Sequence, residues 1–179
     1  HLGASTEEAQ ENVALDVAKQ IGEFLTQGTI VNALNSPTAS PEVLEKLGPL
    51  IPLCEKIGHL HGQLCDELPK RVQINYYGDV IKHPTRILTS AVLKGLLTPV
   101  LSETKVNFVN APILAQERGL AVQESKFNAH TDYTNLVEVV LEYNKASCIL
   151  AGTVFGKNRE RIVRFDNSYP EFRPEGAIL

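Results

Sequence analysis

Two long runs of apolar and β-branched residues in the second half of the chain constrain the fold more than any other feature. The runs cover residues 136–143 and 147–155, and the turn Asn144-Lys145 is almost all that separates them. Strands joined by so short a turn pair as an antiparallel hairpin. A third run, residues 159–165, follows the turn Gly156-Lys157-Asn158 and extends the same pattern. This part of the chain is therefore expected to form consecutive antiparallel strands.

An earlier strand and several helices complete the predicted domain. Residues 72–76 alternate between apolar and polar as in a strand, and a weaker strand is expected near residues 121–126. Gly58 and Gly62, four residues apart, indicate close backbone packing on one helix face. Helical spacing of apolar residues predicts helices within residues 43–64 (broken near Pro49), 85–97 and 110–119. The predicted class is α+β, an antiparallel sheet of about four strands with helices on one face.

A separate helix is predicted at the N-terminus. Ser5 and Glu8 form a capping box, and apolar residues then recur at helical spacing from Ala9 to Leu25. The polar, proline-containing stretch 35–41 that follows is typical of a linker. We therefore expect a domain boundary in this stretch, with residues 1–35 before it and the α+β domain over residues 36–179.

Charge and composition narrow the possible partners. The formal net charge of −4 does not favour binding to nucleic acid. No apolar run approaches the roughly 18 residues that a membrane-spanning helix needs, so no membrane partner is expected. Cys54, Cys65 and Cys148 are too scattered for a disulfide framework or a zinc site, which favours a reducing, cytoplasmic location.

Histidines offer only weak candidates for chemistry. His59 and His61 lie two residues apart on a predicted helix, so their side chains diverge and cannot share a metal ion. One of them is expected to pack inside and the other to be exposed. His83 is expected in a loop, as are His130, Asp132 and Tyr133, near which no nucleophile is identifiable. No glycine-rich phosphate loop of either common spacing is present.

A basic cluster near the C-terminus is the better candidate. On a regular strand Arg159 and Arg161 share one face and Arg164 lies on the other, while Tyr169 and Arg173 follow in a segment that can fold back beside the strand. Guanidinium groups converging with a phenol suit a carboxylate or a phosphate. The alternative is a solvated strand edge that its charges protect from aggregation.

The N-terminal stretch His1-Leu2-Gly3-Ala4-Ser5-Thr6 is similar to the catalytic-histidine segment of the D-3-phosphoglycerate dehydrogenase family. The rest of the chain looks like the intervening, or allosteric substrate-binding, domain of the long form of the enzyme. The stretches that carry this second resemblance are Asp66–Pro69, Leu93–Leu97, Val106–Pro112 with Glu117-Arg118-Gly119, Gly152–Gly156, Arg161–Val163 and Phe172–Gly176.

The resemblance implies roles for two residues at the start of the chain. His1 matches the family's general acid/base, which exchanges a proton with the substrate hydroxyl while hydride passes to or from NAD. Gly3 matches a position close to the nicotinamide. The family's arginine and glutamate partners of the histidine, and the whole dinucleotide-binding fold, are not within these 179 residues. The resemblance therefore implies an NAD-dependent parent enzyme and a fragment that is inactive by itself and holds no cofactor.

The resemblance also implies an effector site. The family's intervening domain holds an anion with basic residues, which match Arg161 and Arg173, and Tyr169 falls where some relatives have histidine. The expected function is thus regulation and assembly in a serine-pathway dehydrogenase. Its expected partners are a phosphate-bearing molecule, upstream catalytic domains, a downstream ACT domain and further copies in a homo-oligomer. A purely structural spacer or dimerisation module, and a related serine dehydratase domain, are the alternatives.

Overall fold

The computed structural model describes residues 6–27, 41–64, 67–101, 105–129, 131–144, 146–156 and 158–176. The chain divides into two compact units, residues 1–38 and 39–179. The boundary predicted between residues 35 and 36 lies outside the described residues, as do Ser5, His130 and the N-terminal motif at residues 1–5.

The first unit contains the predicted N-terminal helix, α1 (Glu7–Gln27). At its start the Thr6 hydroxyl accepts a hydrogen bond from the Ala9 amide, at 3.2 Å. The apolar stripe predicted for this helix is present but largely uncovered. Val13, Val17 and Ile21 retain 50%, 47% and 53% of their exposure.

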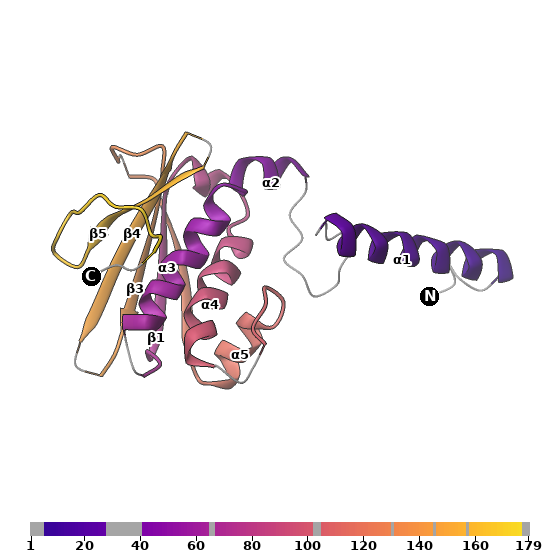
Figure 1. The fold of residues 1–179 in the computed structure, drawn as a ribbon, viewed down its shortest axis with the longest axis horizontal. Helices are drawn as coiled ribbons and strands as arrows, with labels where there is room; N and C mark the ends of the chain where they lie inside the picture. The colour runs from indigo at the N-terminus through magenta and orange to yellow at the C-terminus, as the bar shows by residue number, and fades with distance from the viewer. Residues whose placement is uncertain are drawn as a thin grey trace. The chain divides into compact units, whose positions relative to one another are not determined.

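The second unit alternates helices and strands in the order expected for an α+β domain (Figure 1). Its helices are α2 (Pro41–Leu47), α3 (Leu50–Leu64), the 3-10 helix η1 (Asp79–Lys82), α4 (Arg86–Val100) and α5 (Ala111–Glu117). Its strands are β1 (Arg71–Gly78), β2 (Ala121–Phe127), β3 (Asn135–Glu142), β4 (Ser147–Phe155) and β5 (Arg159–Phe165).

The described strands form one five-stranded sheet in the order β2-β1-β3-β4-β5. The predicted hairpins are confirmed, because β3, β4 and β5 pair as antiparallel neighbours. The prediction of about four antiparallel strands is wrong in one respect: the fifth strand, β2, runs parallel to β1. Helices α4 and α5 carry the chain back along the sheet between these two strands, and such a crossover yields a parallel pair.

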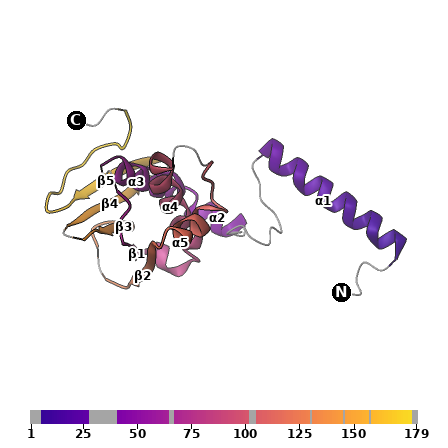
Figure 2. The ribbon, with the colours of Figure 1, turned by 90° about the horizontal axis from the view of Figure 1, so that it is seen from below.

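Helices α3 and α4 cover one face of the sheet (Figure 2). The core lies between them and alternate strand residues such as Ile74, Val139 and Leu150, all fully buried. The close helix contact predicted from Gly58 and Gly62 is confirmed. A Cβ atom added at Gly58 would overlap the Val92 carbonyl oxygen of α4 and lie 2.8 Å from the Leu96 nitrogen.

Candidate anion-binding site

The basic residues of β5 stand on the sheet face opposite α3 and α4. Arg161 pairs with Thr153 of β4 and Arg164 pairs with Ala151, while a register shift lies between Ala151 and Gly152. Thr153 and Ala151 are two residues apart on β4 and share a face. The prediction that Arg164 lies on the opposite sheet face from Arg161 is therefore wrong. The bulge inserts one extra residue between the two arginines, so that both side chains lie on the same face.

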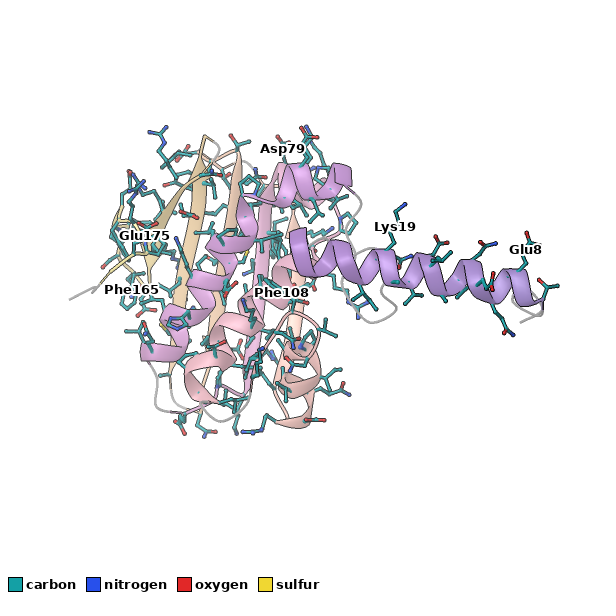
Figure 3. The ribbon with its side chains drawn as sticks, turned by 45° about the vertical axis from the view of Figure 1, so that its right-hand side comes forward. Glu8, Lys19, Asp79, Phe108, Phe165 and Glu175 are labelled. Atoms are coloured by element: carbon teal, nitrogen blue, oxygen red, sulfur yellow. The ribbon has the colours of Figure 1, made fainter. Side chains whose placement is uncertain are left out.

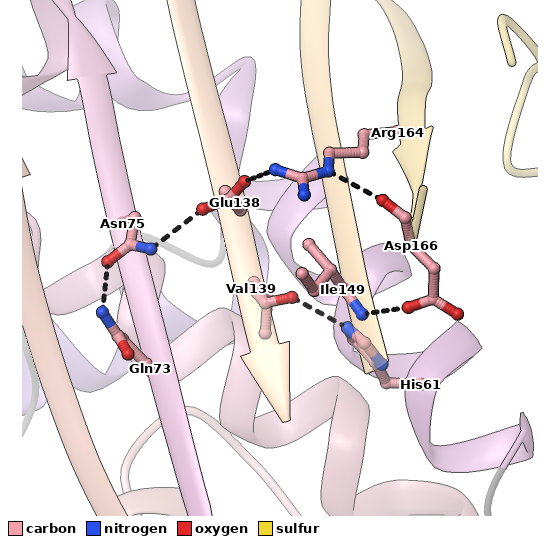
Figure 4. Close-up of polar contacts among 8 residues, drawn as sticks. All are labelled: His61, Gln73, Asn75, Glu138, Val139, Ile149, Arg164 and Asp166. Carbon is pink, nitrogen blue, oxygen red and sulfur yellow. Dashed lines mark hydrogen bonds and ion pairs between the residues drawn. The ribbon is translucent and has the colours of Figure 1, made fainter. Parts of the chain in front are cut away.

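Arg164 is held in a polar chain across this face (Figure 4). Its Nη1 donates to the Glu138 carboxylate at 2.6 Å, and Asn75 Nδ2 donates to the other oxygen of Glu138 at 2.9 Å. The Arg164 Nε donates to the Asp166 carbonyl at 2.9 Å, and the Asp166 carboxylate accepts from the Ile149 amide at 2.7 Å. With its charge matched in this way, Arg164 is a structural residue rather than a ligand-binding one.

Replacement of Arg164 tests this structural role. Arg164→Met would leave Glu138, whose side chain is only 12% exposed, without its cationic partner. We expect the free energy of unfolding to fall by about 2 kcal/mol, less than for a fully buried pair. Urea denaturation measures the change, and the double variant Glu138→Met/Arg164→Met should recover much of the loss. A change within about 0.5 kcal/mol for the single variant would show that the ion pair contributes little.

The C-terminal segment, residues 166–176, turns back along β5. Ile162 and Phe172 exchange two backbone hydrogen bonds, of 3.0 and 3.2 Å, in an antiparallel bridge. The same register sets Arg161 directly opposite Arg173, where cross-strand Cβ atoms are about 5 Å apart. Ile162 and Phe172 pack into the core or against it, so the arginines one residue away stand on the other face. Two like charges are thereby placed side by side.

Among the described residues, these two arginines make only one direct ion pair with a carboxylate. Arg161 Nη1 donates to its neighbour's carbonyl, Glu160 O, at 2.9 Å, and Arg161 Nε lies 3.5 Å from the exposed Glu171 carboxylate. Arg173 is exposed and makes no side-chain hydrogen bond or ion pair with another described residue. Like charges directly opposite one another repel, and a shared anion would relieve that repulsion.

The pKa of the nearby Glu175 carboxylate responds to the positive charges of Arg161 and Arg173. Glu175 accepts a hydrogen bond from Lys56 of α3 at 3.1 Å and lies on the C-terminal segment beside β5 (Figure 3). The hydrogen bond and charge of Lys56, followed by the charges of Arg173 and then Arg161, hold the pKa of Glu175 below its usual range. The field of both arginines therefore reaches this carboxylate, and Lys56 ties it to α3 through an ion pair.

Tyr169 stands apart from the arginine pair. Its side chain is exposed, at 78%, and its ring lies 5.9 Å from the Arg164 guanidinium carbon. Of the three residues predicted to hold an anion, Arg161 and Arg173 are brought together, while Tyr169 contacts the arginine that the polar chain has already neutralised.

The remaining candidates take structural positions or lie outside the described residues. His1 and Gly3 fall outside them. The prediction for the histidine pair is confirmed for His61, which is fully buried, whereas His59 is half-buried instead of exposed. His83 follows η1 in a half-buried position. Burial raises the pKa of the Cys54 thiol above its usual range, which keeps it protonated.

Neither a metal site nor a membrane-spanning helix is found in the part of the chain that the structure describes. No group of three or more histidine, cysteine, aspartate or glutamate side chains there is arranged to hold a metal ion. Within the same residues, every helix is too short or too polar to cross a bilayer.

Comparison with known proteins identifies the family. The model of the D-3-phosphoglycerate dehydrogenase intervening domain matches residues 46–166. A D-3-phosphoglycerate dehydrogenase of Archaeoglobus fulgidus is 36% identical over 179 residues, which cover 100% of this chain and 34% of that protein. Those of Synechocystis sp. and Bacillus subtilis are 39% and 33% identical, again over 100% of this chain and over 32% and 34% of their own lengths.

The chain spans about a third of the length of these relatives. The resemblance drawn from the motifs is confirmed along the whole sequence, and the domain model falls within the second structural unit. This chain therefore belongs to the D-3-phosphoglycerate dehydrogenase family and contains that family's intervening domain.

Proposed function

We propose that this chain is the regulatory and assembly part of an NAD-dependent D-3-phosphoglycerate dehydrogenase, and that Arg161 and Arg173 bind an anionic effector or the phosphate of a substrate. In the parent, catalytic domains upstream would hold NAD and carry out the hydride transfer, and an ACT domain would follow in a homo-oligomer. His1 and Gly3 would belong to the catalytic part, with residues 1–35 as its C-terminal end. The relatives' shared name supports the parent activity.

One observation carries the anion site. The antiparallel bridge between Ile162 and Phe172 sets Arg161 opposite Arg173, and Arg173 has no ion pair with another described residue. Each guanidinium offers several donors in a planar fork that matches the oxygens of a phosphate. The competing Glu171 carboxylate is 64% exposed and 3.5 Å from Arg161 Nε, a contact weak enough for an incoming anion to displace.

The bound anion would regulate the parent enzyme if it bound more tightly to one arrangement of the enzyme's domains than to another. The C-terminal segment carries Arg173 and is attached to β5 and, through Glu175, to α3. An anion held by Arg161 and Arg173 would stiffen that attachment. It would therefore favour the arrangement of neighbouring domains that the stiff segment permits.

Calorimetric titration of the full chain with inorganic phosphate tests the site. Arg161→Gln and Arg173→Gln should each weaken binding about tenfold, because a charge-assisted hydrogen bond contributes about 1.5 kcal/mol or more. Arg118→Gln, an exposed arginine after α5, is the matched control and should bind phosphate as the wild type does. Unchanged affinity in both site variants would remove the assignment.

A second measurement distinguishes anion-dependent regulation from the alternative function, a structural spacer or dimerisation module. Analytical ultracentrifugation with and without phosphate reports the association state. A dimer whose mass is independent of phosphate, combined with no phosphate binding by the wild type, would favour the spacer.

A further inference from the structure

A groove lies at the opposite edge of the sheet, where α4, α5 and β2 meet. Helix α5 lies beside both α4 and β2 (Figure 2), and the groove has a volume of about 320 Å³. Arg86, Ser90 and Leu93 line it from α4, at the helical spacing that places residues on one face. Leu120 directly precedes β2, and Val122 and Glu124 of that strand, two residues apart, lie on one sheet face.

The side chain of Ser90 lines this groove. Ser90 is only 1% exposed, and its side chain makes no hydrogen bond with another described residue. The neighbouring hydroxyl of Thr89 is 2.9 Å from the Tyr76 hydroxyl and is satisfied. The Ser90 hydroxyl is therefore available to a ligand that enters the groove.

The groove also carries one positive and one negative charge. Thr85 donates its hydroxyl hydrogen to Glu124 Oε2 at 2.9 Å, which orients the carboxylate and leaves Oε1 available. Neither Arg86 nor Glu124 forms an ion pair with the other or with any further described residue. An anion alone would meet the Glu124 carboxylate, and a cation alone would meet the Arg86 guanidinium.

The wall between these charges is apolar. Leu93 is 1% exposed and Leu120 is 6% exposed. Val122 of β2 is 38% exposed, so a bound ligand could cover its side chain. Covering an exposed valine with an aliphatic group is favourable in proportion to the apolar area removed from water. Opposite charges, a central hydroxyl and an apolar wall together select a small molecule that bears all three complementary features.

We propose that this groove binds a small aliphatic α-amino acid as its zwitterion. Its carboxylate pairs with Arg86, its ammonium group pairs with Glu124 Oε1, and the Ser90 hydroxyl hydrogen-bonds to either group. Its side chain covers Leu93, Leu120 and Val122. This site is independent of the anion site, because it lies at the β2 edge of the sheet whereas Arg161 and Arg173 lie at the β5 edge.

Titration of the full chain with L-valine and two truncated analogues tests the proposal. Isovalerate lacks the amino group and isobutylamine lacks the carboxylate, and each should bind at least tenfold more weakly than L-valine. Arg86→Gln and Glu124→Gln should each weaken L-valine binding at least tenfold, and Ser90→Ala should weaken it a few-fold. Glu117→Gln and Arg118→Gln, exposed residues near the groove that do not line it, are the matched controls.

The position of binding is read independently from NMR. The methyl resonances of Leu93, Leu120 and Val122 should shift with L-valine, and those of Ile162 and Val163 on β5 should not. No binding of L-valine at tens of millimolar, or unchanged affinity in both charge variants, would overturn the proposal. Equal binding of isovalerate would overturn the zwitterion and identify a site for simple carboxylates instead.

Discussion

Gly58→Ala is expected to destabilise the second unit more than any other single change considered. The added Cβ would overlap the Val92 carbonyl and lie 2.8 Å from the Leu96 nitrogen. These are backbone atoms of α4, so the clash can be relieved only by moving the two helices apart. Such a shift would loosen the core between the helices and the sheet, at a cost of about 3 kcal/mol or more. That is a large share of the stability of a domain this size, about 5–15 kcal/mol.

Denaturation in urea, followed by circular dichroism, measures the effect. Gly95→Ala should act similarly from the other helix, because its Cβ would overlap the Glu55 carbonyl oxygen and lie 2.8 Å from the His59 nitrogen. The double variant should cost less than the sum of the two, since one separation of the helices relieves both clashes. Gly22→Ala on α1 is the matched control, because nothing lies within 4 Å of its added Cβ. Wild-type stability in Gly58→Ala would contradict the close contact.

Acidification from pH 7 to pH 5 is expected to cost the second unit about 2 kcal/mol through His61 alone. His61 is fully buried on α3, and its Nε2 donates to the Val139 carbonyl at 3.2 Å (Figure 4). The other ring nitrogen, Nδ1, has no hydrogen-bond partner among the described residues. Burial lowers the pKa of His61 from 6.5 to about 4, against smaller opposing effects of the Val139 hydrogen bond and the Asp166 charge.

The sign of the effect follows from proton binding. Between pH 6.5 and about 4 the unfolded chain holds a proton on this histidine that the folded chain does not. Stability is therefore lost as the pH falls through this window, and the loss from this group is complete below about pH 4. Asp79 and Glu175, whose pKa values are lowered by hydrogen bonds and charges of lysines, lose their contributions only as the pH falls below their ordinary values of 3.8 and 4.5, outside the range from pH 7 to pH 5.

The measurement is the free energy of unfolding at pH 7, 6 and 5. His61→Leu should flatten the profile across this range and change stability at pH 7 by only about 1 kcal/mol, since one hydrogen bond is lost while an unsatisfied nitrogen is removed. His83→Leu, in the half-buried loop after η1, should keep the wild-type slope. An unchanged slope in His61→Leu would show that another group titrates.

Much of the architecture could be predicted from residue patterns that act over short distances. The runs at residues 136–143 and 147–155 predicted the β3–β4 hairpin, because alternating or continuous apolar residues around a short turn leave few other pairings. The spacing of Gly58 and Gly62 predicted a close helix contact, since only a residue without a side chain permits backbones to approach so nearly. The anion site inferred from the basic residues on and after β5 stays a prediction.

Other features depended on residues distant in the sequence. The direction of β2 was not predictable locally, because an edge strand can pair in either sense until helices α4 and α5 set its path. Arg164 lies on the same face as Arg161 only because of the bulge opposite Ala151 and Gly152, and no residue pattern predicted that bulge. The groove lined by Arg86 and Glu124 joins residues 38 positions apart, and the sequence offered no motif for it.

The sequence by itself determined the family, the helices and most strands, because these depend on the identities and spacing of neighbouring residues. Only the tertiary structure decided which charged groups meet. It set Arg161 opposite Arg173 through the Ile162–Phe172 bridge, matched Arg164 to Glu138, and buried His61 rather than His59. Charges on one strand acquire partners only when strand register and helix packing bring other segments beside them, and those are properties of the whole folded unit.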